Sequence, residues 1–334
     1  MKSKIIASML VFALIGLVQF ETRSQSNNQK AKTNDSISVS LDISKRQGLI
    51  YVSHIVLDYV SVLDPESDHL IGKIKAGNGP CCVELSSDNG YIANYKSNDI
   101  TVFDKKTGKT ITSVTAGDHP SHLVLTADSL YLLIGHESND GLWFLDTRTN
   151  QITKKLPDGT GYLCRYENGE KIYQSQIFIP SVFVIDPETQ TIVNTIDVGG
   201  RPLELAFTPD QKYICVANYD LNELEEIDTE IDSVVARIPN VNDARGIAIT
   251  LDGKFAYVSN VKSATVTIVD LASVAIVKVI KVGRMPTSIA FRTDGKYAYV
   301  SCQGNASIFV IDTQTQEIVK SIAVGSNPIN VQVK

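Results

Sequence analysis

The 334-residue sequence lacks the short motifs that mark the common catalytic and cofactor-binding classes. It contains no C-x-x-C-H haem-attachment motif, no Walker loop, no G-x-S-x-G elbow and no zinc-type pair of cysteines. It also lacks a basic run and carries a formal net charge of −6. Because Lys and Arg supply most of the affinity of proteins for phosphate backbones, this balance argues against nucleic acid as a partner.

Only one long apolar run is present, from Ile5 to Phe20, and two lysines precede it. The run is shorter than the roughly 20 residues of a membrane-spanning helix, and small residues stand just before Gln25. We therefore expect residues 1–24 to be a signal peptide, with an uncleaved anchor as the alternative. A lipid anchor is not expected, because no cysteine lies near the end of the run. Residues 25–36 are polar and indicate a solvated linker. The mature protein is then expected in the periplasm or outside the cell, with no membrane span.

A repeat of about 42 residues fills the rest of the sequence. Short hydrophobic stretches end in Asp seven times, spaced 40, 42, 40, 42, 42 and 42 residues apart. Another short stretch ends ten residues before each Asp, and in most copies a Gly-x-x-Pro turn ends sixteen residues after it. The seven aspartates are Asp64, Asp104, Asp146, Asp186, Asp228, Asp270 and Asp312.

Each copy holds four alternating or apolar runs separated by turn residues, without helical periodicity. The Asp-Gly pairs at 252–253 and 294–295 suit tight hairpins between the first two runs. A Thr or Ser three residues after most of the seven aspartates suits a capped turn between the third and fourth runs. Four strands cannot bury both faces alone, so the copies should stack around a channel. The sequence predicts an all-β fold, a seven-bladed β-propeller over residues 37–334.

The repeat resembles that of the YVTN-repeat propellers, an exported bacterial family. The segments that carry the resemblance are PTSIAFRTDGKYAYVSC, SIFVIDTQT and IVKSIAVGSNP near the end of the sequence. In the third and fourth copies LLIGH and YQSQ replace the YVTN-like strand. The resemblance implies a binding architecture without a shared catalytic motif.

Two segments compete to close the ring in the first blade. Residues 37–43 are placed for a local hairpin with residues 50–54, whereas residues 329–333 continue the repeat. The pattern of apolar residues does not distinguish the two.

The interblade turns and the ends of the second strands should share one face of the propeller, called the top face here. Four of the five histidines fall there, and only His69 does not. At strand ends such side chains can simply cap the following turn, and imidazoles at a concave mouth can also bind a metal or small ligand. We predict a ligand site at the top mouth that includes His119, His122, His136, Glu204, Cys82 and Cys302, with His122 and His136 as candidate metal ligands.

The five cysteines leave an odd thiol in a compartment that is normally oxidising. Cys164 and Cys215 replace large hydrophobic residues of the repeat and are expected to be buried. Cys81, Cys82 and Cys302 map to the top rim. Their pairing cannot be assigned from the pattern.

Three functions remain open. The first is a non-enzymatic binding or scaffold module, with a small molecule, a glycan or an envelope protein at the top face of a monomer. The second is a metal-assisted hydrolase or lyase resembling the lactonase-type propellers, with Glu204, His122 and His136 near a divalent ion. The third is a redox partner. Metal content of the mature protein would separate them.

Overall fold

A computed structural model describes residues 48–138, 140–166 and 169–334. Almost every described element is a strand, and the strands form seven four-stranded antiparallel sheets. The expected signal peptide and linker lie outside the described residues. Within the described part, no helix has the length and hydropathy needed to cross a bilayer.

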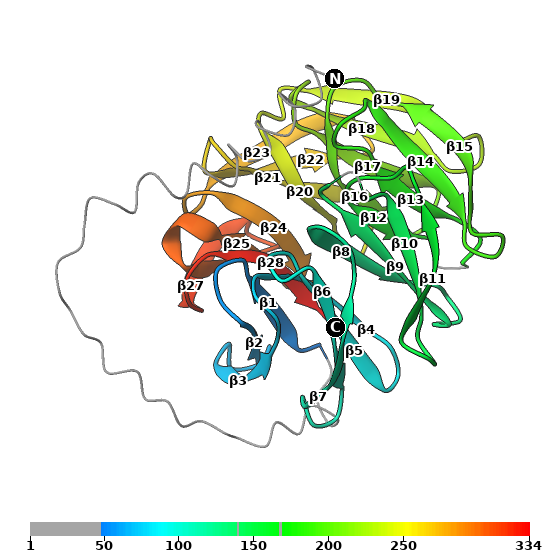
Figure 1. Ribbon diagram of the computed structural model, residues 1–334. Coiled ribbons are helices and arrows are strands. Elements are labelled where there is room, and N and C mark those ends of the chain that lie inside the picture. Colours follow the sequence, from blue (N-terminus) through cyan, green and yellow to red (C-terminus); the bar gives the residue numbers. More distant parts are fainter. Residues whose placement is uncertain (1–47, 139, 167–168) are drawn as a thin grey trace, which may run out of the picture. The chain divides into compact units, whose positions relative to one another are not determined.

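The first four sheets in chain order share the four-stranded arrangement, although the two inner strands of the fourth are short (Figure 1). Blade 1 contains β1 (Ile50–His54), β2 (Tyr59–Leu63), β3 (Leu70–Lys75) and β28 (Pro328–Val333); blade 2 contains β4 (Pro80–Leu85), β5 (Asn89–Asn94), β6 (Asp99–Asp104) and β7 (Thr110–Thr115); blade 3 contains β8 (Pro120–Leu125), β9 (Tyr131–His136), β10 (Leu142–Asp146) and β11 (Gln151–Leu156); blade 4 contains β12 (Leu163–Arg165), β13 (Ile172–Ser175), β14 (Ser181–Asp186) and β15 (Thr191–Asp197).

The last three sheets have the same order, and one short 3₁₀ turn, η3 (Gln303–Asn305), follows the second strand of blade 7. Blade 5 contains β16 (Pro202–Phe207), β17 (Tyr213–Asn218), β18 (Glu223–Asp228) and β19 (Ser233–Pro239); blade 6 contains β20 (Ala244–Ile249), β21 (Phe255–Asn260), β22 (Thr265–Asp270) and β23 (Ala275–Lys281); blade 7 contains β24 (Pro286–Phe291), β25 (Tyr297–Cys302), β26 (Ser307–Asp312) and β27 (Glu317–Ala323).

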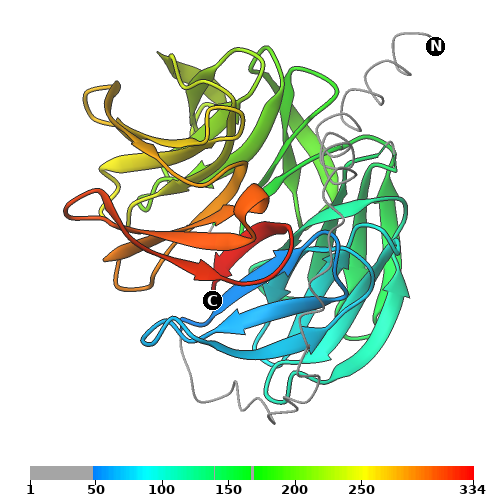
Figure 2. The same ribbon diagram turned by 90° about the vertical axis from the view of Figure 1, so that its left-hand side faces the viewer.

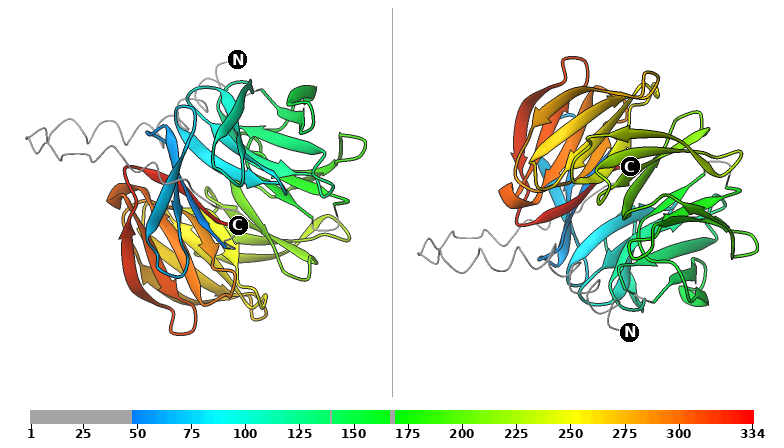
Figure 3. Two further views of the ribbon diagram at one scale, coloured as in Figure 1. Left: turned by 90° about the horizontal axis from the view of Figure 1, so that it is seen from below. Right: turned by 90° about the horizontal axis from the view of Figure 1, so that it is seen from above.

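The innermost strands meet in a closed ring, which confirms the predicted seven-bladed propeller. Each of β28, β4, β8, β12, β16, β20 and β24 contacts the next, and β24 contacts β28. The blades follow one another around the ring in the order of their colours (Figure 3). The ring is closed by β28, which pairs antiparallel with β1 and places Val331 opposite Val52. Figure 2 shows this red strand beside the blue strands of blade 1. Of the two candidate closing segments, residues 329–333 take this place, and residues 37–43 lie outside the described residues.

The hydrophobic core lies between blades, because each sheet has two apolar faces to bury. On one face of blade 1, Tyr51 and Val62 pack with Phe103 of blade 2. On the other face, Val52 and Val331 pack with residues of blade 7. Adjacent blades therefore share a core, and the ring cannot lose one blade without exposing two apolar faces.

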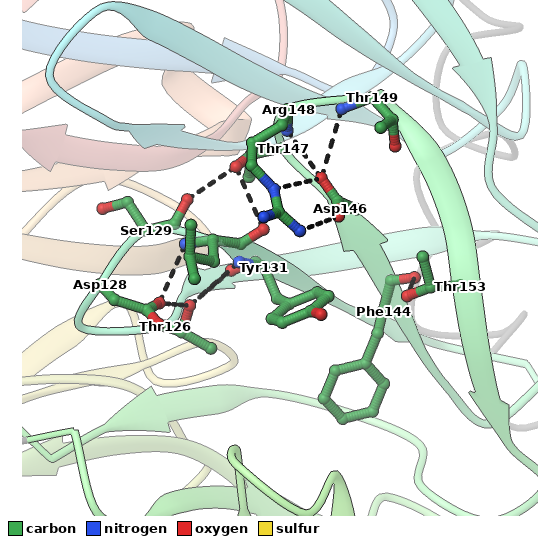
Figure 4. Close-up of polar contacts among 11 residues, drawn as sticks. Thr126, Asp128, Ser129, Tyr131, Phe144, Asp146, Thr147, Arg148, Thr149 and Thr153 are labelled. Atoms are coloured by element: carbon green, nitrogen blue, oxygen red, sulfur yellow. Dashed lines mark hydrogen bonds and ion pairs between the residues drawn. The ribbon is translucent and has the colours of Figure 1, made fainter.

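The seven repeated aspartates cap the turns between the third and fourth strands. In every copy the carboxylate accepts a backbone N–H from the residue two or three positions later. Figure 4 shows Asp146 with Arg148 and Thr149, beside the hairpin that holds Thr126 and Asp128. This geometry agrees with the structural role expected for a residue that recurs seven times.

Candidate functional site

The polar residues that end the second strands hold the interblade turns. His136 has no exposed surface, and its Nδ1 and Nε2 lie 2.8 Å from the Gly141 carbonyl and 2.5 Å from the Ala116 carbonyl. His54 contacts the Ser326 carbonyl and the Ser61 hydroxyl in the same way. Both histidines therefore cap the turns beside them, which is the structural role considered in the sequence analysis. Ligation of a metal by His136 would require one of these contacts to break.

The five cysteines are all free thiols. Cys82 and Cys302 have no exposed surface, and burial raises the pKa of each thiol to about 12. Cys81 is also buried, and its Sγ lies 3.3 Å from the Pro120 carbonyl. Cys215 is buried as expected, whereas Cys164 is only partly buried, although desolvation still raises the pKa of Cys164 to about 12. A thiol of this kind stays protonated at neutral pH and is a weak nucleophile.

His122 and Glu204 belong to innermost strands and face the centre of the ring. The Leu163 N–H donates to Nδ1 of His122 at 3.3 Å, and the ring lies 5.0 Å edge-on from Tyr162. Nε2 of His122 is buried without a hydrogen-bond partner in the described structure. Burial lowers the pKa of His122 to about 4, so this imidazole is neutral at pH 7.

Glu204 binds the inner edge of the next blade. Its Oε2 accepts the Ile247 N–H at 3.0 Å, which satisfies a backbone donor that the edge strand leaves open. A Cβ at Gly246 would lie 2.9 Å from the same oxygen, so the absence of a side chain there makes room for the carboxyl group. Burial raises the pKa of Glu204 to about 8, against the opposing effects of the Ile247 hydrogen bond and of Arg245.

His119 lies beside these residues on the turn before β8. Its ring is 4.4 Å from that of Tyr95, and its Nδ1 lies 3.1 Å from the Asp118 carboxylate. The side chain keeps about a quarter of its surface exposed. His119 therefore remains partly accessible to solvent.

The structure adds side chains from other blades that the sequence analysis did not single out. Arg245 of β20 reaches the Tyr162 hydroxyl at 3.4 Å, and it interacts electrostatically with Glu137 and Glu204. Tyr95 interacts in turn with Glu137 and Tyr162. Since these groups come from five consecutive blades, they can meet only near the axis of the ring. We call Tyr95, Glu137, Tyr162, Glu204 and Arg245 the mouth cluster.

Arg245 differs from the other charged groups near the axis. Deeper in the ring, Lys334 is paired with Glu84 at 2.6 Å, and Gln332 accepts the Val83 N–H at 2.9 Å. Arg245 has no carboxylate within 4.0 Å in the described part of the chain. Burial raises the pKa of Glu137 as well as that of Glu204, which favours their neutral forms and leaves the guanidinium charge poorly balanced.

Two residues of the mouth cluster, Arg245 and Glu137, are unusual for their positions in the repeat. Arg245 is the single cation among the residues that directly follow the interblade Pro or its equivalent, and Glu137 is the single carboxylate among those that directly follow the second strands. No three His, Cys, Asp or Glu side chains gather closely enough to hold a metal ion in the part of the chain that the structure describes. The arrangement can offer a guanidinium, two phenols and one open imidazole nitrogen.

Comparison with known proteins places this chain among β-propellers. The family model of the cytochrome D1 heme domain matches residues 180–288, about a third of the chain. That family is a β-propeller family, whereas the resemblance to YVTN-repeat propellers stays an expectation from the sequence. A curated relative, antigen Lp49 of Leptospira interrogans, is 27% identical over 136 residues, which cover 38% of this chain and 30% of that protein.

Solved structures with the same fold are distant in sequence. Hydrazine synthase of Kuenenia stuttgartiensis superposes with a TM-score of 0.68 at 19% identity, over 77% of this chain and 90% of that one. Dihydro-heme d1 dehydrogenase NirN in complex with DHE gives 0.65 at 15%, over 84% and 74%. A functionally unknown protein from Desulfotomaculum acetoxidans gives 0.73 at 15%, over 86% and 99%. At these identities the likeness shows the propeller fold.

Proposed function

We propose that this protein is an exported binding module whose mouth cluster takes a small molecule through a carboxylate group. The observation that carries the proposal is the guanidinium of Arg245. It lies among inward-facing side chains of five blades, with one long hydrogen bond to Tyr162 and no carboxylate in ion-pair contact within the described residues. Arg presents a planar fork of donors that matches a carboxylate in two hydrogen bonds.

The surroundings of Arg245 suit a planar or conjugated molecule. The Tyr95 ring contacts His119 in a tilted arrangement at 4.4 Å and Tyr162 meets His122 edge-on at 5.0 Å, so aromatic rings stand on two sides of the mouth. Aromatic walls with a few converging polar groups are typical of small-molecule sites. The open Nε2 of His122 offers a further contact to the same ligand.

The family match supports a tetrapyrrole as one member of this ligand class. Residues 180–288, which resemble the cytochrome D1 heme domain, include both Glu204 and Arg245. Haem carries carboxylates, and its iron commonly takes an imidazole ligand. Arg245 would hold a carboxylate of such a group and the neutral imidazole of His122 would face its metal. A bound haem would supply electron-transfer or redox chemistry.

A thermal-shift comparison of acids with their methyl esters tests this proposal. Succinate, an aromatic carboxylate and protoporphyrin IX would each be compared with the ester, which keeps the shape and loses the charge. A ligand of the folded state raises the melting temperature according to its concentration relative to Kd. We expect at least one acid to stabilise the protein and its ester to fail. Equal shifts for acids and esters, or no shift with any acid, would overturn the proposal.

The export of the protein is a separate part of the proposal. The support is the charged start and apolar run of residues 1–24. We expect the mature chain to begin near Gln25 and to be recovered outside the cytoplasm. An intact mass that includes Met1, with recovery in the cytosol, would contradict export.

A further inference from the structure

Blade 5 breaks the repeat at one pair of facing residues in its middle strands. Cys215 of β17 lies opposite Glu226 of β18. In the other six blades this pair is made of an aromatic or aliphatic residue opposite another apolar one: Tyr51 and Val62, Tyr91 and Val102, Leu133 and Phe144, Tyr173 and Val184, Tyr257 and Ile268, Tyr299 and Val310.

The two departures change the chemistry of the blade interior: Cys215 packs in the hydrophobic core, and Glu226 lines a groove. A cysteine fills much less volume than the tyrosine of five other blades, and a glutamate brings a carboxyl group where the others have only hydrocarbon. Glu226 is 8% exposed. Within the described structure, no donor lies in hydrogen-bond or ion-pair distance of its carboxyl group. Its carboxyl oxygens keep some accessible surface, so a ligand can reach them, and a carboxyl group with so little water around it gains from a cationic partner.

Glu226 lies in the wall of a groove of about 480 Å³ between blades 5 and 6. The groove opens on the bottom face, opposite the interblade turns, because the first hairpin turns of both blades line it. Its apolar lining includes Pro209, Tyr213 and Leu271. Two exposed carboxylates, Asp210 and Asp252, stand at its rim.

The rim carboxylates are held in fixed positions by the turns. The Thr208 hydroxyl donates to Asp210 at 2.7 Å, and the Thr250 hydroxyl donates to Asp252 at 2.7 Å. Two lysines flank the rim: Nζ of Lys254 lies 3.7 Å from Asp252 and is mostly exposed, and Lys212 interacts electrostatically with Asp210. The groove therefore presents three acidic groups, of which the most deeply buried has no partner.

The geometry points to a second binding site in this groove, for a primary ammonium group on a hydrocarbon stem. The apolar walls suit the stem and Glu226 receives the charged end. A calcium ion would need six to eight oxygen ligands, and no group of three ligating side chains exists among the described residues. The same chemistry is offered by a free alkyl diamine and by a lysine side chain of a partner protein. This site is on the opposite face from the mouth cluster and does not depend on the proposed function.

Binding of two probes to the mature protein tests the inference. Calorimetric titration with cadaverine represents the free diamine, and titration with a short lysine-containing peptide capped at both ends represents the partner. We expect at least one probe to bind, and Glu226→Gln to weaken it by tenfold or more. Binding of cadaverine alone assigns a diamine, and binding of the peptide alone assigns a partner protein.

Two further variants make the result decisive. Glu226→Val installs the residue that four other blades have at this position, so it should keep or raise the melting temperature while it abolishes binding. Glu230→Gln makes the same chemical change in the neighbouring groove between blades 4 and 5 and should leave binding unchanged. No binding of either probe to a folded protein, or equal losses with Glu226→Gln and Glu230→Gln, would overturn the inference.

Discussion

Deletion of residues 328–334, which removes the closing strand β28, should weaken the whole ring. Val331 is 1% exposed, and its burial contributes about 1.5–3 kcal/mol. Four registered pairs run from Ile50 with Val333 to Ser53 with Asn330. At about 1 kcal/mol net for each ladder hydrogen bond, they add roughly 4 kcal/mol. The total of about 6 kcal/mol is comparable with the entire stability of a typical protein, about 5–15 kcal/mol.

The sole tryptophan, Trp143, reports this effect from a distance, because it lies in β10 of blade 3. In urea unfolding followed by its fluorescence, the deletion should lower the midpoint strongly or abolish the cooperative transition. Val319→Ala changes a half-exposed residue of the outer strand β27 and should shift the midpoint little. Adding the peptide PINVQVK should restore part of the lost stability. An unchanged Trp143 transition after the deletion would refute cooperative closure of the ring.

The remaining predictions concern the interior. Gly246→Ala should cost about 1–3 kcal/mol in urea unfolding, since its Cβ would lie 2.5 Å from the Thr287 carbonyl oxygen and 2.9 Å from Glu204 Oε2. Burial raises the pKa of Glu204 to about 8, so the contribution of this group to stability is complete below about pH 4.5 and is lost as the pH rises towards 8. The free energy of unfolding should therefore fall between pH 5 and pH 8. Glu204→Gln should make this fall smaller. Arg237→Met leaves Glu225 buried without its ion pair and should cost about 3–5 kcal/mol, more at pH 9 than at pH 5, by denaturant titration. Thiol titration should detect the four buried cysteines, Cys81, Cys82, Cys215 and Cys302, only after unfolding.

The blade count was predictable because the repeat has a fixed internal spacing. Asp270 and Asp312, for example, lie 42 residues apart and cap equivalent turns in two successive blades, so their positions show where each blade lies in the sequence. The closing strand was not predictable, because residues 37–43 and 329–333 carry equally suitable strand patterns. Choosing between them requires the packing of Val331 against blade 7, which no local pattern contains.

The site was predictable only in part, for a geometric reason. The repeat position shared by His122 and Glu204 does face the axis. The direction of the Arg245 side chain was not predictable, because the strand register shifts between Ala244 and Ile247 and side chains do not alternate regularly at this end of β20. His136 was placed at the mouth by its strand-end position, and its direction into the Gly141 and Ala116 carbonyls depends on the neighbouring turns.

The central claim is that Arg245 anchors a carboxylate at the mouth of the ring. The most direct measurement is the Kd of whichever of succinate, the aromatic carboxylate and protoporphyrin IX stabilises the protein most, for the mature protein, for Arg245→Met and for Arg148→Met, which alters an exposed arginine of a turn in blade 3. A hydrogen bond to a charged group contributes about 1.5–3 kcal/mol, which corresponds to roughly 10- to 100-fold in affinity. The account predicts a loss of that size for Arg245→Met alone. Equal affinities in the three folded proteins, or no binding to any of them, would contradict it.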